Sequence, residues 1–281
     1  MRRSLLFIPA SSPAMLQNAD VFGADAVIFD LEDAISVEEK DAARILLNRF
    51  LTRYPLDNIE VIVRINGLDS PYFLDDLESL KELRINTIMV PKATVNDLIF
   101  LDDWIKEYHA NKDLGFIPII ESAEAVLNIK EISMQKRVNG LLLGAEDLAS
   151  DLGVRRTKDG TEIFVARSMV VLAAKSRGYD AIDTPFIDTA DEFGLIEDTK
   201  FAKTIGMNAK ACIHPNQVLQ INQVLSPSLD EIERAQRILL KEKAVNKGVF
   251  SVDGKMVDKP ILDRARKTLM LARKWKLIAD E

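Results

Sequence analysis

The chain has 281 residues, of which 47% are hydrophobic and 29% charged, and its formal net charge is −7. This is ordinary globular composition, and an acidic chain without a long basic stretch is not expected to be a general nucleic-acid or membrane binder. The single cysteine, Cys212, offers no disulfide framework, so we expect a cytoplasmic protein with a buried, inert thiol. The apolar stretch that ends at Pro9 is too short for a signal peptide or a spanning helix.

Eight short apolar runs recur along the chain, and most of them end in a charged or polar residue. They cover residues 5–9, 26–33, 61–64, 88–92, 116–121, 141–147, 181–183 and 211–214. Amphipathic segments of helical length separate them, the clearest at 41–53, 71–83, 95–108, 161–177 and 188–205. Continuous apolar runs are typical of strands buried on both faces of a parallel sheet. The alternation predicts an α/β fold, a (β/α)8 TIM barrel whose active site lies at the C-terminal ends of the strands.

The pattern changes after the eighth run. Residues 229–245 predict a charged amphipathic helix, and residues 260–278 predict another. Between them, Asp253-Gly254 is a hairpin turn signal that joins residues 249–252 to residues 255–257. We therefore expect a barrel catalytic domain over 1–225 and a C-terminal helix–hairpin–helix extension over 226–281. Because a hairpin buries little by itself, the extension is expected to pack on the barrel or on a neighbouring subunit.

Acidic side chains end two neighbouring predicted strands. Glu121 ends the fifth, and Glu146 and Asp147 end the sixth. Adjacent strands lie about 4.7–4.9 Å apart, so a carboxylate from each can meet one hard cation. Mg²⁺ is the expected ion, because it takes one or two carboxylates plus water and substrate oxygens, whereas the chain lacks the histidine pair or cysteine cluster typical of zinc. The alternative is that these acids cap the helices that follow.

Two cations end the third and fourth predicted strands, Arg64 and Lys92. An arginine can bind a carboxylate through two parallel hydrogen bonds, and beside Mg²⁺ this suits a 2-oxo acid or its enolate. The alternative is that each cation pairs with a strand-end acid such as Glu32 or Asp33, and both can hold together. Asp30 and Glu32 face the same way, and we expect them to orient Arg64 or the water around a metal.

The sequence is less informative about two histidines and one glycine. His214 ends the eighth run and is expected to be an acid or base, or to hold a loop. His109 lies near a helix end and is expected to be solvated. Gly144 is expected to permit a tight turn. The chain contains neither a GxGxxG string nor a Walker A string, so nothing in it supports a nucleotide cofactor.

At these residues the sequence resembles the HpcH/HpaI aldolase and citrate lyase β-subunit family, across nearly its full length. The matching stretches are residues 3–9, 24–34, 64–66, 90–92, 120–122, 143–148, 213–217 and 254–258, in the family's order and spacing. The resemblance implies a barrel with a C-terminal extension, assembled as a homotrimer or as a hexamer. It also implies Mg²⁺ at Glu121 and Asp147, and a substrate carboxylate at Arg64. From their places at neighbouring strand ends, Lys92 and Glu32 are expected as further substrate-binding residues.

The resemblance further implies a carbon–carbon lyase. Members cleave or form the bond between an acyl thioester such as acetyl-CoA and a 2-oxo acid, as in citryl-, citramalyl- or malyl-thioester lyases. In the stand-alone CoA-dependent members, the position of Asp258 supplies a catalytic carboxylate, and the extension closes over a neighbouring subunit's site. Arg64 and Asp258 are therefore the expected catalytic residues.

The carrier of the thioester stays open. Many CoA-using members have a basic residue after the first strand, whereas here residues 10–13 are uncharged. The alternatives are a Mg²⁺-dependent aldolase that joins free pyruvate or oxaloacetate to an aldehyde, and a β subunit that uses an acyl-carrier protein inside a multienzyme citrate lyase. A barrel-shaped binding protein without activity is the third, although the complete set of acids and cations argues against it.

Overall fold

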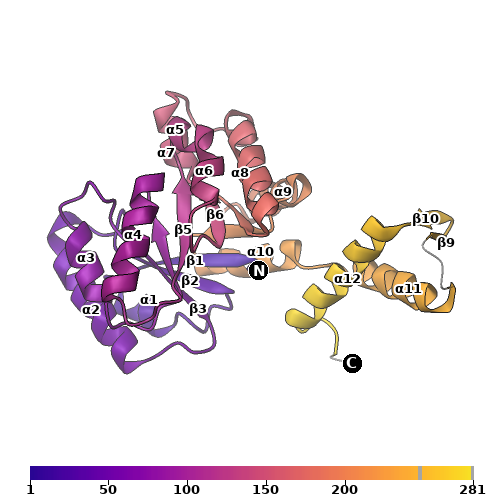
Figure 1. Ribbon diagram of the computed structural model, residues 1–281, viewed down its shortest axis with the longest axis horizontal. Coiled ribbons are helices and arrows are strands. Elements are labelled where there is room, and N and C mark those ends of the chain that lie inside the picture. The colour runs from indigo at the N-terminus through magenta and orange to yellow at the C-terminus, as the bar shows by residue number, and fades with distance from the viewer. Residues whose placement is uncertain (246–248, 280–281) are drawn as a thin grey trace. The chain divides into compact units, whose positions relative to one another are not determined.

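The computed structural model describes residues 1–245 and 249–279 (Figure 1). The chain divides into two compact units, Met1–Asn222 and Gln223–Glu281. None of the helices in the described ranges is long and apolar enough to cross a membrane.

Eight parallel strands close into a barrel in chain order, and β1 pairs with both β2 and β8. The strands are β1 (Ser4–Pro9), β2 (Ala26–Asp30), β3 (Glu60–Arg64), β4 (Thr87–Val90), β5 (Gly115–Ile120), β6 (Gly140–Leu143), β7 (Asp180–Asp183) and β8 (Ala209–Cys212). Each strand overlaps one of the eight predicted apolar runs, and the strands form a closed parallel barrel, so the predicted (β/α)8 fold is confirmed. The interior is packed with apolar side chains at most 2% exposed, among them Leu5, Ile28, Ile62, Met89, Ile117, Leu142 and Ile182.

Helices follow the strands and cover the outside of the barrel (Figure 1). They are α1 (Pro13–Gln17), α2 (Lys40–Arg53), α3 (Phe73–Leu80), α4 (Val95–Tyr108), α5 (Ala123–Leu127), α6 (Ile129–Ser133), α7 (Ala145–Asp151), α8 (Phe164–Arg177), α9 (Glu192–Ile205) and α10 (Val218–Leu225). Short 3₁₀ turns lie at Val37–Glu39, Thr161–Ile163 and Pro215–Gln217. Three helices start later than predicted: α3 at Phe73 instead of 71, α8 at Phe164 instead of 161, and α9 at Glu192 instead of 188. A 3₁₀ turn precedes α8, and the side chain of Asp191 caps α9.

The second unit has its own small core. It comprises α11 (Leu229–Val245), the strands β9 (Phe250–Val252) and β10 (Lys255–Val257), and α12 (Lys259–Lys274). The strands pair antiparallel across Asp253 and Gly254, whose φ angles of 51° and 74° are the left-handed values that a two-residue hairpin turn needs. Side chains of α11, the hairpin and α12 bury one another, among them Ile238, Val257 and Leu269. The predicted helix–hairpin–helix is therefore present, and its packing on a neighbouring subunit stays a prediction.

Candidate active site

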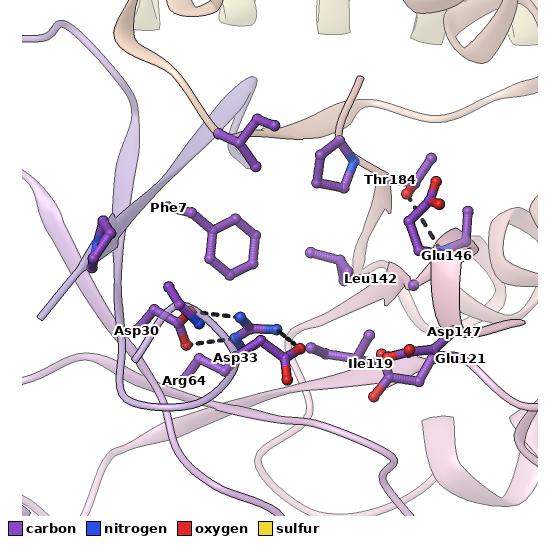
Figure 2. A pocket seen from close by; sticks show the side chains of 16 residues that line it. Phe7, Asp30, Asp33, Arg64, Ile119, Glu121, Leu142, Glu146, Asp147 and Thr184 are labelled. Atoms are coloured by element: carbon purple, nitrogen blue, oxygen red, sulfur yellow. Dashed lines mark hydrogen bonds and ion pairs between the residues drawn. The ribbon is translucent and has the colours of Figure 1, made fainter. Parts of the chain in front are cut away.

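A cavity of about 440 Å³ opens at the C-terminal ends of the barrel strands. One side of it is charged and carries Arg64, Glu121 and Asp147, whereas Phe7 and Leu142 belong to an apolar side (Figure 2). The full lining is Phe7, Pro9, Asp30, Asp33, Ala34, Arg64, Ile119, Glu121, Leu142, Gly144, Ala145, Glu146, Asp147, Thr184, Pro185 and Ile213. The cavity therefore offers a polar end and an apolar end to one small molecule.

Arg64 is the cationic centre of this cavity. Its Nε and Nη2 donate to the two carboxylate oxygens of Asp30 at 2.7 and 2.6 Å, and Nη1 lies 2.9 Å from Oε2 of Glu32 and 3.4 Å from Oδ2 of Asp33. Its guanidinium carbon lies 4.9 Å from the centre of the Phe7 ring. Because Nε and Nη2 are occupied by Asp30, a substrate carboxylate would meet the guanidinium at Nη1, in competition with Glu32 and Asp33.

The acids around Arg64 are themselves held by the chain. Asp30 is 1% exposed and accepts hydrogen bonds from the backbone amides of Glu32 and Ala34 at 2.9 and 3.0 Å. Glu32 contacts Arg64, but its Oε2 accepts no well-aligned hydrogen bond from any described residue. Burial raises the pKa of Glu32 to about 7, although the charge of Arg64 opposes the shift. The sequence-based expectation that Asp30 and Glu32 orient Arg64 agrees with this geometry.

Glu121 lies directly after β5 and is 6% exposed. Its Oε1 accepts a hydrogen bond of 2.5 Å from the backbone amide of Lys92. Burial raises the pKa of Glu121 to about 8, and the neighbouring carboxylates of Asp147 and Glu32 add to the shift. The amide of Lys92 and the charge of Arg64 lower the pKa of Glu121, but they do not outweigh its burial.

Glu146 and Asp147 do not end a strand, because β6 stops at Leu143 and both lie in the first turn of α7. They point to different sides: Asp147 lies beside Glu121, whereas Glu146 turns toward Thr184 (Figure 2). Glu146 pairs with Nε of Arg156 at 2.9 Å. Only Asp147 is therefore placed to act together with Glu121.

The other predicted site residues lie elsewhere. The side chain of Lys92 is exposed and lines a neighbouring cavity of about 390 Å³, so the structure brings its backbone rather than its ammonium to Glu121. Asp258 lies in the second unit, where its side chain caps α12 by accepting from the amide of Ile261 at 3.3 Å. His214 is exposed, and its Nδ1 accepts from the amide of Asn216 at 3.2 Å, which is the loop-holding arrangement.

One expectation about a histidine is wrong. His109 is 0% exposed rather than solvated, and its Nδ1 accepts a hydrogen bond of 2.9 Å from the amide of Asn111. It packs against Trp104, with ring centres 5.8 Å apart. The ring is enclosed by α4 and by the chain that turns from α4 toward β5, and helical periodicity does not record this burial.

Sequence reasoning also missed Lys40, a buried cation of α2. Its Nζ donates to the carbonyl oxygens of Leu31 and Glu32 at 2.8 and 2.7 Å and to Oδ1 of Asn66 at 2.8 Å. Lys40 thus fixes the backbone of the loop that carries Glu32. An isolated lysine at the start of an amphipathic helix gives no sequence signal for such a role.

The donor set fits a hard divalent cation. Glu121 and Asp147 provide two carboxylates, and the described residues contain no group of three or more His, Cys, Asp or Glu side chains able to hold a metal. Mg²⁺ is usually held by one or two carboxylates, with the remaining positions taken by water and substrate oxygens. A cation between the two acids would also offset the unfavourable burial of charge that raises the pKa of Glu121.

Comparison with known proteins gives consistent results. A family model described as HpcH/HpaI aldolase/citrate lyase matches residues 3–215. The citrate lyase subunit beta of Leuconostoc mesenteroides subsp. cremoris is 36% identical over 293 residues, covering 100% of this chain and 96% of the relative. A (3S)-malyl-CoA thioesterase of Cereibacter sphaeroides is 36% identical over 274 residues, covering 96% of this chain and 94% of the relative.

Solved structures agree with the sequence relatives. The protein CitE from Mycobacterium tuberculosis, in complex with magnesium, acetoacetate and coenzyme A, is similar with a TM-score of 0.82 at 32% identity, covering 96% of this chain and 98% of that one. The citrate lyase beta subunit of the same organism, complexed with oxaloacetate and magnesium, gives a TM-score of 0.71 at 32% identity over 80% of this chain and 97% of that one.

Proposed function

Because the chain belongs to the HpcH/HpaI aldolase/citrate lyase family, we propose that it is a Mg²⁺-dependent lyase of a 3-hydroxyacyl thioester. Membership of this family makes the chain a carbon–carbon lyase. The proposed reaction cleaves a citryl-, citramalyl- or malyl-type thioester to a simpler acyl thioester, such as acetyl-CoA, and a 2-oxo acid, or forms the bond in the reverse direction.

The observation that carries the proposal is the charged side of the cavity. Arg64 ends β3, Glu121 directly follows β5 and Asp147 lies in the first turn of α7, and all three line one cavity of about 440 Å³. This volume suits a small substrate of a few carbon atoms, with a carboxylate at Nη1 of Arg64 and a carbonyl or hydroxyl oxygen toward the two acids. The apolar side, with Phe7 and Leu142, remains for the acyl part.

In the cleavage direction, the hydroxyl group of the substrate gives its proton to solvent, its oxygen becomes the carbonyl oxygen of the 2-oxo acid, and the adjacent carbon–carbon bond breaks. The electron pair of that bond passes to the acyl thioester as its enolate, whose α carbon then takes up one proton, so no proton is gained or lost overall. Mg²⁺ at Glu121 and Asp147 would supply positive charge for the oxygen of the 2-oxo acid. Arg64 binds the carboxylate of that acid, so the reacting carbonyl is held in one orientation.

The carboxylate of Asp258 is proposed to exchange the proton with the acyl carbon. In the condensation direction it removes a proton from the methyl group of the acyl thioester, and in cleavage the proton returns. We assign it to the site of a neighbouring subunit in a cytoplasmic homotrimer or hexamer, on the strength of the family resemblance. Light scattering of the purified chain tests the assembly.

Two observations bear on the carrier of the thioester. Residues 10–13, which follow β1, have no charged side chain that could bind the phosphates of CoA. This favours a carrier-protein arm, or an aldolase reaction of free pyruvate with an aldehyde. The relative from Leuconostoc mesenteroides bears the name of a citrate lyase subunit, which supports a second proposal, that the chain acts inside a multienzyme lyase. Affinity purification from the native host tests for partner chains.

The purified chain should be incubated with Mg²⁺ and with citryl-, citramalyl- and malyl-CoA, and with the corresponding thioesters of a phosphopantetheine carrier protein. Release of a 2-oxo acid, measured with a coupled dehydrogenase, identifies both the acyl group and the carrier. Turnover that persists fully in EDTA would contradict the metal requirement. Turnover of free pyruvate with an aldehyde, but of no thioester, would select the aldolase.

A further inference from the structure

Glu121 occupies a slot that other residues have built for it. Its Oε1 is taken by the amide of Lys92 at 2.5 Å, and no hydrogen bond to its Oε2 is found within the described part of the chain. The second oxygen is therefore the one left for a ligand in the cavity. The two sides of this slot are formed by backbone, from the end of β4 and the end of β6.

Gly144 forms the first side. A Cβ atom added to it would lie 2.5 Å from Oε2 and 2.6 Å from Cβ of Glu121, and 2.9 Å from Cγ2 of Ile119. All three distances are well below van der Waals contact. Gly144 is the single residue between β6 and α7, and its φ angle of −92° is one that any residue adopts, so this turn does not need glycine for its backbone conformation. The glycine is needed for the space that it leaves to Glu121.

Lys92 forms the second side. Its φ angle of 45° lies in the left-handed region, which is sparsely populated by residues other than glycine and asparagine. The amide of this residue donates to Oε1 of Glu121, while its side chain remains exposed. Unfavourable backbone conformations of this kind persist where the surrounding structure holds them, and they gather at functional sites.

We propose that Gly144 and the left-handed backbone of Lys92 are positioning elements for the metal-binding carboxylate of Glu121. This inference rests on the proposed function and deepens it. The backbone amide of Lys92 cannot rotate away from Glu121 as a side chain could. The absence of a Cβ atom at Gly144 leaves room for the carboxylate of Glu121 in the placement that the structure shows. Glu121 is therefore held beside Asp147 before a cation arrives, and the affinity for the cation depends on residues that never touch it.

The test measures metal binding directly, with Mn²⁺ as the probe and electron paramagnetic resonance or calorimetry as the readout. Gly144→Ala is expected to raise the dissociation constant roughly 10- to 100-fold, as loss of an orienting contact does at other metal sites. Gly140→Ala is the matched control, since it adds the same methyl group to β6 and meets Ile182 at 3.1 Å instead of Glu121. Its affinity should remain within about twofold of wild type.

A double-mutant cycle separates positioning from general damage. In a Glu121→Gly background neither the carboxylate nor Cβ of residue 121 remains, and only Cγ2 of Ile119 still crowds the new methyl group. Adding Gly144→Ala to that background should therefore lower the melting temperature less than it does in the wild-type chain. Equal effects in both backgrounds would overturn the proposal. If Gly144→Ala alone fails to fold and the double variant folds, the clash with Glu121 is established. Failure of both to fold would show that Gly144 serves the backbone instead.

Lys92→Gly tests the other side of the slot. It keeps the amide and removes the ammonium, so Mn²⁺ affinity should stay within about twofold of wild type. A tenfold or larger loss would show that the lysine side chain, not its backbone, supports the site. If the wild-type chain binds no Mn²⁺ or Mg²⁺, the metal-dependent function fails together with this inference. If wild type and Gly144→Ala bind equally, only the inference fails.

Discussion

Single residues of the cavity have different kinds of partner, and the partners decide what each can do. Arg64 has three acids within 3.4 Å, yet only Asp30 engages it through two hydrogen bonds. Asp30 is in turn fixed by two backbone amides, so it does not depend on Arg64 for its hydrogen bonds. The guanidinium is held in one orientation, which is the condition for binding a planar carboxylate.

Replacement of Arg64 by lysine is expected to impair substrate binding more than stability. An ammonium cannot serve Asp30 with two parallel bonds and a substrate at the same time. We expect KM for the 2-oxo acid in the condensation direction to rise at least about tenfold, the effect of losing one hydrogen bond to a charged group. The control is Arg84→Lys, whose side chain is 77% exposed. An unchanged KM for Arg64→Lys would contradict the assignment.

Asp258 has a structural role that can be separated from its proposed chemistry. Asparagine caps a helix about as well as aspartate does, so Asp258→Asn should retain the start of α12 and melt near the wild-type temperature. Loss of the carboxylate should nevertheless lower kcat by about 100-fold or more, the usual contribution of a general acid or base. Asp263→Asn, an exposed acid on the same helix, is the control. Full activity of Asp258→Asn would refute its catalytic role.

At the scale of elements, the barrel strands are tied to their helices by buried charges as well as by apolar packing. Lys210 on β8 contacts Asp183 on β7 at 2.6 Å and Asp198 on α9 at 2.7 Å, and Arg167 on α8 contacts the same two acids at 2.9 and 2.7 Å. Burial alone would raise the pKa of Asp198, but the charges of Lys210 and Arg167 outweigh it and lower the pKa. The four residues join β7, β8, α8 and α9.

Lys210→Met should therefore destabilise the protein strongly. Removing one member leaves buried carboxylate charge without its partner, which costs about 3–5 kcal/mol. For a unit of this size that corresponds to a melting temperature about 10 °C lower. Lys200→Met on α9 breaks an ion pair whose members are 59% and 52% exposed, and it should cost less than about 1 kcal/mol. Equal shifts for the two variants would argue against the buried cluster.

For the whole molecule, the two ends of the barrel have different tasks. At the N-terminal end, Arg2 donates to Glu60 on β3 at 2.6 Å through each of Nε and Nη2, and to Asp180 on β7 at 3.0 Å. These contacts close the end of the barrel opposite to the cavity. The charged groups of the C-terminal end instead surround open space. The residues at the N-terminal end of the barrel thus stabilise the fold, whereas those at the C-terminal end form the site, as in other barrels of this kind.

Buried titratable groups make the stability of the whole molecule depend on pH. Burial lowers the pKa of His109 below its ordinary value of 6.5, so the unfolded chain takes up a proton more readily than the native protein does. The contribution of His109 is therefore unchanged above pH 6.5 and is lost as the pH falls below it. Glu32 and Glu121, whose pKa values burial raises, contribute with the opposite sign.

The contribution of His109 to stability is obtained by comparing wild type with a variant that lacks the imidazole. Wild type and His109→Gln should be melted by calorimetry between pH 8 and pH 5, in EDTA. The stability of wild type relative to the variant should be constant above pH 6.5 and should decline below it. A constant difference over the whole range would show that His109 titrates equally in the native and unfolded states.

The barrel fold, the hairpin and three of the charged residues of the cavity were predictable from the amino-acid sequence by itself. Apolar runs of strand length, alternating with amphipathic segments, determine a barrel because local periodicity records which faces are buried. The charged residues that follow the runs then share one end, because the strands are parallel. Arg64, Glu121 and Asp147 could be named on that basis, and Asp253-Gly254 identified the hairpin.

Only the tertiary structure decided which of these groups meet. Glu146 and Asp147 are adjacent in sequence, but α7 begins between them and β6, so they point to different sides of the cavity. Lys92 contributes its amide instead of its charge, and Gly144 contributes the absence of a side chain. These facts depend on contacts between distant segments, whereas sequence patterns report on neighbours within one element. The sequence pattern within one element shows which of its residues are buried. It does not show which residues of other elements those side chains contact.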